Sequence, residues 1–131
     1  MKIIVIKVMN LNKVFEAGRL TRDPETTTLP NSNTTVTNLG FVTNRVFKNK
    51  NDEKVEEATF IDVKAWGKTG ETIAKYLKKG SPIFIEGRIT QETWDTKEGD
   101  KRSKLVITLE NYKFINDGSR KEEEPKDDLG F

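Results

Sequence analysis

The segment TFIDVKAWG, residues 59–67, departs from the usual pattern of a half-buried strand. Successive side chains of a strand point to opposite faces, so the segment divides into two alternating sets. One set, Ile61, Val63 and Ala65, is an ordinary apolar core face. The other set combines two aromatic rings with a carboxylate and an ammonium group: Phe60, Asp62, Lys64 and Trp66. Charged side chains are rarely fully buried, so the pattern predicts a strand whose solvent-facing side carries aromatic residues.

Four further strands and one helix are predicted from the rest of the chain. The strands are expected at residues 12–20, 34–47, 82–94 and 104–114. The residues expected to point inward from the last three of these strands are Leu39, Phe41, Ile83, Ile85, Ile89, Leu105, Ile107 and Leu109. Residues 67–80, GKTGETIAKYLKKG, change to a helical period, because Ile73, Tyr76 and Leu77 form one stripe.

The order of these elements indicates the fold. Three strands, a helix and two strands, bent by internal glycines and joined by the charged tips KNKNDEK and DTKEGDKRS, match a five-stranded Greek-key barrel of the OB type. The chain is therefore predicted to be all-β with one short helix, as a single domain over residues 9–115. Residues 1–8, MKIIVIKV, form an extension of uncertain role. They are interpreted as an extra strand, or as sequence upstream of a start at Met9.

Charge is distributed unevenly along the chain. The net charge is +2, but residues 116–131 contain six acidic and three basic residues, and the remaining residues therefore carry +5. The acidic segment is almost free of apolar residues, which predicts a disordered tail. A basic body with an acidic tail would suit a polyanionic partner.

Several function classes are disfavoured by what the sequence lacks. The chain contains no cysteine and no histidine, which removes thiolate chemistry, the commonest general base and the commonest metal ligand. The carboxylates Asp62, Glu86 and Glu92 are scattered among cations, and there is no phosphate-binding GxxxxGK[ST] loop. No apolar run reaches the ~20 residues that span a bilayer, and residues 1–8 are too short for a secretory signal. We therefore expect no enzymatic activity, no cofactor, no metal and no membrane association.

Exposed aromatic residues recur among charged ones. Phe47 ends the second strand beside Arg45, and Trp94 ends the outward face of the fourth strand, as Phe60 and Trp66 do on the third. Nucleobases stack on aromatic rings at ~1–3 kcal/mol each, and cations follow the phosphates. Because a duplex hides its base faces, the pattern favours single-stranded nucleic acid. Each ring alone is also compatible with packing under a loop or against another subunit.

The two charged hairpin tips add cations beside these rings. The basic residues that flank the tips are Arg45, Lys48, Lys50, Lys54, Lys97, Lys101, Arg102 and Lys104. So placed, they could hold a strand from both sides, and each neutralised phosphate gives a salt slope of about −0.7. Solubility alone is the other interpretation of such charges.

The sequence resembles the bacterial single-stranded DNA-binding proteins of the homotetrameric OB-fold type. The resemblance covers most of residues 9–115 and is carried by NKVFEAGRLTRDPE, by TFIDVKAWGK with ETIAKYLKKGSPIFIEGRI, and by TWDTKEGDKRSKLVIT. It implies base stacking on Phe47, Phe60, Trp66 and Trp94. It also implies phosphate contacts at Lys48, Lys50, Lys68 and Lys79, beside the Arg45, Lys97 and Arg102 expected from the hairpin tips.

The resemblance extends to the cellular role. It implies a homotetramer, or a dimer, in the cytoplasm and associated with the nucleoid, which binds single-stranded DNA without sequence preference during DNA replication, recombination and repair. The last five residues resemble the family's acidic tip, which docks on genome-maintenance proteins: Asp127, Asp128, Leu129, Gly130 and Phe131. An ordinary charged terminus is the alternative for this tip.

Some features depart from the family pattern. Residues 26–34, TTTLPNSNT, replace a stretch that usually carries a basic residue and a glycine turn, the linker is short, and Gly130 stands where proline is typical. Asp62 and Glu92 place acid beside stacking rings, and we expect them to weaken binding or raise its salt sensitivity. Phe84, Tyr112 and Phe114 are spare apolar surface for subunit contacts. Two rival functions stay open, an RNA-binding OB module and a protein-interaction adaptor.

Overall fold

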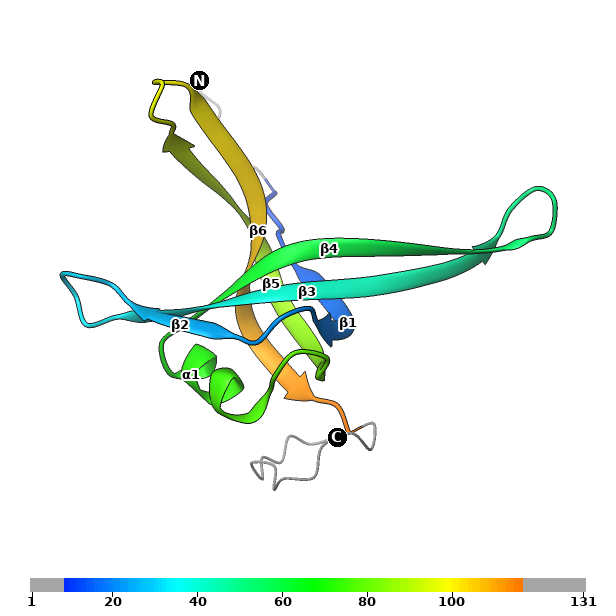
Figure 1. Ribbon diagram of the computed structural model, residues 1–131, viewed down its shortest axis with the longest axis horizontal. Coiled ribbons are helices and arrows are strands. Elements are labelled where there is room, and N and C mark those ends of the chain that lie inside the picture. The colour runs from blue at the N-terminus through cyan, green and yellow to red at the C-terminus, as the bar shows by residue number, and fades with distance from the viewer. Residues whose placement is uncertain (1–8, 117–131) are drawn as a thin grey trace, which may run out of the picture.

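The computed structural model describes residues 9–116. The predictions made for residues 1–8 and for the acidic tail and its tip beyond residue 116 lie outside this range. The elements, in chain order, are β1 (Val14–Leu20), β2 (Glu25–Thr28), β3 (Thr35–Lys48), β4 (Lys54–Trp66), α1 (Gly67–Tyr76), β5 (Pro82–Asp95) and β6 (Lys101–Phe114). Their arrangement is shown in Figure 1.

Five of the strands close into a barrel. Neighbouring strands follow the order β1-β5-β6-β4-β3, and β1 pairs again with β3 through Arg19 with Val42 and Leu20 with Phe41. All pairings are antiparallel except that of β4 with β6. This closed five-stranded barrel confirms the OB-type fold predicted from the order of elements.

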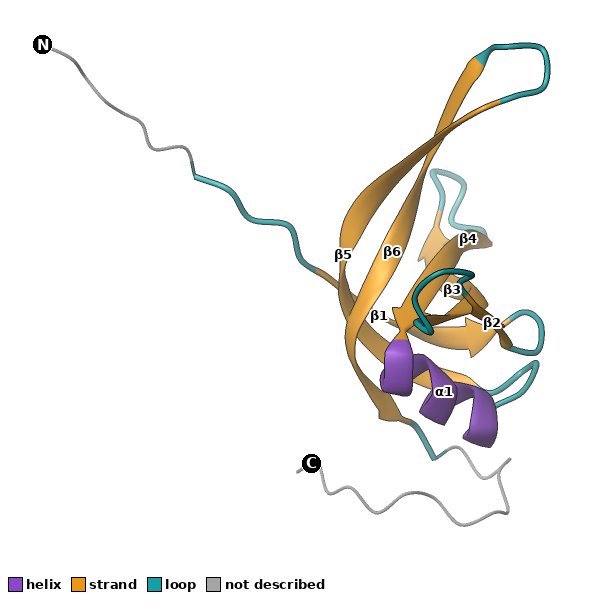
Figure 2. Cartoon of the chain, turned by 90° about the vertical axis from the view of Figure 1, so that its left-hand side faces the viewer, coloured by secondary structure: helices purple, strands orange, loops and turns teal. Residues whose placement is uncertain are grey.

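The barrel encloses one hydrophobic core, which the inward alternation of β3, β4 and β5 supplies. Leu39, Phe41, Val63, Ile83 and Ile85 are almost fully buried, as the sequence predicted. Helix α1 packs against the barrel (Figure 2) and adds a buried Ile73 to this core.

Gly70 sets the distance between α1 and the barrel. A Cβ at this position would collide with the Ala65 carbonyl oxygen and the Thr37 side chain. Glycine costs about 1 kcal/mol relative to alanine inside a helix, so α1 gives up intrinsic helix stability in exchange for close packing on β3 and β4.

The strand β2 was missed by the sequence-based prediction, which expected no strand between residues 20 and 34. Its four exposed residues, ETTT, pair with Thr35–Asn38 at one edge of β3. The hydroxyl groups of Thr26 and Thr37 hydrogen-bond at 2.8 Å. A short polar strand has no apolar period to reveal it, and it forms here because the edge of β3 supplies its backbone partners.

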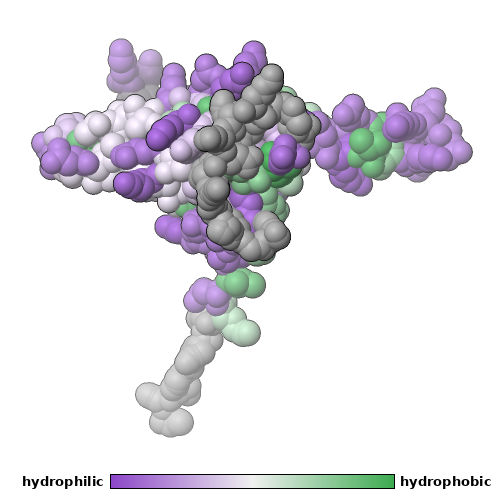
Figure 3. Space-filling model, turned by 90° about the horizontal axis from the view of Figure 1, so that it is seen from below, coloured by the Kyte–Doolittle hydropathy of each residue, from purple (hydrophilic) through white to green (hydrophobic). Residues whose placement is uncertain are grey.

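Two long hairpins leave the barrel and project in different directions (Figure 1). One is formed by the distal parts of β3 and β4, and the other by those of β5 and β6. In Figure 3 the β3–β4 hairpin is largely hydrophilic, with a hydrophobic patch along it. None of residues 9–116 belongs to a helix that is long and apolar enough to cross a membrane.

The second hairpin overturns two inward assignments. Ile89 and Leu105 were predicted to face the core, but they are 42% and 59% exposed, and Val106 is buried instead. The reason is that β5 and β6 run past the end of the barrel, where no other strand within residues 9–116 pairs with them. The register also shifts between Glu86 and Gly87, which leaves Glu110 as an extra residue in β6.

Candidate nucleic-acid interface

The outward side of β4 carries the first two predicted stacking residues. Phe60 is 69% exposed and Trp66 is 43% exposed. Their partners across the β3–β4 ladder are Val42 and Val36. The even-numbered residues of β4 face outward because the odd-numbered Val63 and Ala65 are fixed in the core. Burial of one side therefore dictates the exposure of both rings.

Trp94 lies near the tip of the second hairpin, on β5. Its side chain is 46% exposed, and its partner in the register of β5 and β6 is Arg102. Alternation puts Trp94 on the same side of β5 as Glu92. Glu92 in turn contacts Lys64 of β4, so a polar bridge crosses β6 between the strands that bear Trp66 and Trp94.

Phe47 occupies a different surface from Phe60. Phe60 pairs with Val42, so both side chains lie on the same face of the β3–β4 ribbon. Phe47 is an odd number of residues from Val42 along β3, and its side chain therefore points to the opposite face. Its ring is half-buried and lies under the Arg45 guanidinium, whose carbon is 4.3 Å from the ring centroid. Alternation thus places Phe60, Trp66 and Trp94 on the outward sides of their strands, and Phe47 on the opposite face of the β3–β4 hairpin.

Alternating charges cover the outer surface between the rings. The Asp62 carboxylate accepts a hydrogen bond from Lys104 Nζ at 2.9 Å and lies 3.7 Å from Arg22 Nη2. Lys64 Nζ is 2.6 Å from Glu92 Oε2. The hydrogen bond and the charge of Lys104 hold the pKa of Asp62 below its ordinary value, and the same contact raises the pKa of Lys104.

The predicted phosphate-contacting residues divide into two groups. Arg45 is paired with Glu57 at 3.2 Å, and Lys48 lies 3.9 Å from Asp52. The other five are exposed and form no ion pair with any residue between 9 and 116: Lys50, Lys68, Lys79, Lys97 and Arg102. These five lie at the two hairpin tips and at the two ends of the α1 region. A phosphate can reach these five cations without displacing a carboxylate.

The sequence did not reveal that Arg22, Lys64 and Lys104 form ion pairs with acidic residues of the outer surface. The sequence indicates no role for Arg22, and it predicts Lys104 only as a residue that flanks a hairpin tip. Asp62 and Lys104 are 42 positions apart, so only the alignment of β4 with β6 brings them together. The one signal in the sequence that indicated these ion pairs was the outward placement of Asp62 and Glu92, because acidic residues on a cationic surface are expected to pair with basic ones.

A closed five-stranded barrel with exposed aromatic and cationic side chains on its outer surface defines an OB-fold domain of the kind that binds single strands. The model of the single-strand binding protein family matches residues 11–115, and the chain belongs to this family. The family consists of non-catalytic DNA-binding proteins, in agreement with the prediction that the chain is not an enzyme.

Individual relatives agree with the family assignment. The chain is 50% identical over 106 residues to the single-stranded DNA-binding protein of Aquifex aeolicus, covering 81% of this chain and 71% of that protein. For the Helicobacter hepaticus protein of the same name the identity is 41% over 114 residues, covering 87% and 66%. A mutant of the single-stranded DNA binding protein from Thermus aquaticus superposes with a TM-score of 0.73 at 26% identity, covering 84% of this chain and 53% of that one.

Proposed function

We propose that this protein coats single-stranded DNA with little sequence preference, and so protects and organises it during DNA replication, recombination and repair. Membership of the single-strand binding protein family and the names of the relatives make single-stranded DNA the ligand. The observation that carries the mechanism is the set of rings exposed between ion pairs on the outer surface: Phe60, Trp66 and Trp94.

The mechanism combines stacking with charge neutralisation. Bases stack on the three rings irrespective of their identity, and the five predicted cations that form no ion pair within residues 9–116 meet the phosphates. Phe47, with one ring face already covered by Arg45, takes a base on its other face as the strand passes around the β3–β4 hairpin. The rings project from regular strands, so the platform exists before DNA arrives and little ordering cost is added on binding.

Assembly and partner recruitment complete the proposal. We infer a homotetramer, in which apolar surface away from the rings makes subunit contacts. Phe15, which is exposed, stacks against Phe84 at a centroid distance of 6.4 Å on this surface. The resemblance in the last five residues supports a tip whose carboxylates meet a basic rim on replication, recombination and repair proteins while Phe131 fills a pocket. A cytoplasmic, nucleoid-associated protein follows from this role.

Tryptophan fluorescence during titration with oligothymidine, at several salt concentrations, tests the proposal. The chain has two tryptophans, and both are assigned to the interface, so binding is expected to quench most of the emission at a fixed stoichiometry. Oligouridine of equal length is the control. Stronger quenching by the RNA would favour an RNA-binding module. No quenching by either, in a folded sample, would favour a protein-interaction adaptor and contradict the proposal.

A further inference from the structure

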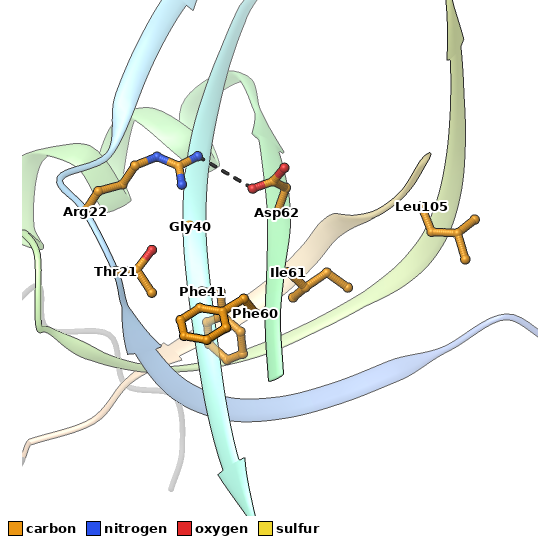
Figure 4. Close-up of a pocket in the computed structure, with 8 residues that line it drawn as sticks. All are labelled: Thr21, Arg22, Gly40, Phe41, Phe60, Ile61, Asp62 and Leu105. Carbon is orange, nitrogen blue, oxygen red and sulfur yellow. Dashed lines mark ion pairs between the residues drawn. The ribbon is translucent and has the colours of Figure 1, made fainter. Parts of the chain in front are cut away.

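A pocket of about 360 Å³ opens beside Phe60 on the proposed interface (Figure 4). Four segments that are distant in sequence form its walls: the residues directly after β1, the middle of β3, the middle of β4, and β6 at Leu105. Its lining includes Thr21, Arg22, Gly40, Phe60, Asp62 and Leu105. The volume is in the range of pockets that hold one small ligand.

Part of the wall of this pocket is apolar, and within residues 9–116 this part is exposed. Phe60 and Leu105 are the most exposed large apolar side chains among its lining residues. The sequence predicts Leu105 in the core, and its exposure has no compensation within the described protein. A flat heteroaromatic ring placed against Phe60 would cover both side chains, which supplies the apolar part of a nucleobase site.

One side of the pocket is polar and offers both an acceptor and donors. The Asp62 carboxylate lies between Arg22 and Lys104, with one oxygen directed at each cation. Figure 4 shows Arg22 and Asp62 side by side at the same edge of the pocket. An ionised carboxylate has about four acceptor positions, so acceptor capacity is left for a further hydrogen bond after both cations are accommodated.

Gly40 keeps this polar edge open. It pairs directly with Asp62 across the β3–β4 ladder. A Cβ at this position would collide with the Arg22 guanidinium and the Thr21 hydroxyl. The absence of a side chain therefore allows Arg22 to lie across β3 and reach Asp62.

We propose that the pocket binds one nucleobase by an edge that carries an exocyclic amino group, with Asp62 as the acceptor for that group. The inference rests on the proposed single-stranded DNA binding and adds a base preference at one position of the strand. Cytosine donates from its N4 amino group, and acidic side chains accept that donor in other complexes. Its neighbouring acceptors face Arg22 or Lys104. Thymine presents an oxygen where cytosine has the amino group, and this oxygen would meet the carboxylate.

The test compares oligodeoxycytidine with oligothymidine of equal length at mildly alkaline pH, where cytosine is neutral. Affinities are measured for the full chain and for the Asp62→Asn variant. The asparagine side chain both donates and accepts, so it tolerates thymine. The ratio of cytidine affinity to thymidine affinity is expected to fall about five- to tenfold in this variant. Differences in stiffness between the two oligomers cancel, because only the ratio is compared between proteins.

Glu92→Gln is the matched control. It removes the same charge from the same outer surface, where Glu92 is paired with Lys64 at 2.6 Å, but Glu92 does not line the pocket. It is expected to change both affinities by the same factor and to leave the ratio unaltered. Leu105→Ala is a second variant at an exposed position, and it is expected to lower the ratio by removing one wall.

The outcomes separate the two proposals. A ratio that falls with Asp62→Asn and Leu105→Ala, but not with Glu92→Gln, supports the base site. An equal ratio in the wild type and Asp62→Asn would mean that Asp62 acts only through its charge, and the base site would be wrong while DNA binding stands. Failure of the wild type to bind either oligomer would instead overturn the proposed function, and the base site with it.

Discussion

Asp62 on β4 and Lys104 on β6 are joined by a 2.9 Å hydrogen bond on the outer surface of the barrel, between strands whose backbone ladder has only two registered pairs. This hydrogen bond occupies a cation that DNA phosphates would otherwise attract. Lys64 and Glu92 repeat the arrangement nearby. The interface is thus partly neutralised before DNA arrives. This pairing supports the expectation that Asp62 and Glu92 weaken binding, and it predicts a lower salt sensitivity rather than a higher one.

Releasing these cations is predicted to steepen the salt dependence of binding. In Asp62→Asn, Lys104 and Arg22 become available to phosphates, and in Glu92→Gln Lys64 does. The slope of log K against log salt is expected to become more negative by about 0.7 for each additional phosphate that is neutralised. Titrations with oligothymidine over a range of salt concentrations measure the slope. An unchanged slope in both variants would show that the paired cations never reach the phosphates.

Truncation of either tryptophan is predicted to weaken binding. Trp66→Ala and Trp94→Ala should each cost ~1–3 kcal/mol of DNA-binding free energy, because each loses one stacking platform. Nearly half of each side chain is exposed and neither belongs to the buried core, so circular dichroism should show an intact fold. Trp66→Phe is the control and should retain most of the affinity, since a ring remains. Wild-type affinity in the alanine variants would contradict the stacking assignment.

Phe47 is predicted to contribute less than Phe60. One face of its ring is covered by Arg45 at 4.3 Å, and it lies on the opposite face of the hairpin ribbon. Phe47→Ala is therefore expected to cost under ~1 kcal/mol of binding free energy, and Phe60→Ala ~1–3 kcal/mol. The same oligothymidine titration measures both, and equal losses would place both rings on one continuous DNA path.

Gly70→Ala is predicted to destabilise the fold although alanine is the better helix former. The added methyl group collides with Thr37 and with the Ala65 carbonyl, and such overpacking costs ~1–3 kcal/mol. The gain in helix propensity of about 1 kcal/mol offsets only part of this. A lower thermal midpoint is expected, measured against Ala74→Gly in the same helix as a propensity control. A higher midpoint for Gly70→Ala would contradict the close packing.

Acid is predicted to destabilise the barrel through two carboxylates. The hydrogen bond from Lys104 holds the pKa of Asp62 below its ordinary 3.8, and those from Lys13 and Arg88 hold the pKa of Glu110 below its ordinary 4.5. A group whose pKa is lower in the folded state stabilises it above the unfolded pKa and loses that contribution as pH falls through the folded pKa.

The measurable window therefore lies below about pH 4. Thermal midpoints should fall there for the wild type and fall less for the variant that combines Asp62→Asn with Glu110→Gln. Because the chain has no histidine, no comparable side-chain titration is expected near neutral pH. A wild-type midpoint that drops mainly between pH 5 and pH 7 would contradict this assignment.

The sequence by itself determined the faces of the long strands and the class of fold. The alternation in residues 59–67 fixed which side of β4 is buried, and it placed Phe60 and Trp66 in solvent, because alternation is a property of the extended backbone. The change to a helical period likewise located α1. The packing role of Gly70 is visible only in the structure, where Thr37 lies against it.

Only the tertiary structure decided the contacts between distant segments. The strand β2, the exposure of Leu105 past the end of the barrel and the pairing of Asp62 with Lys104 all depend on which strands lie together and in what register. A shift in register such as the one beside Gly87 leaves no local signature in the sequence. Local alternation predicts which side of a strand is exposed to solvent. Closure of the barrel determines which other residues each exposed side chain contacts.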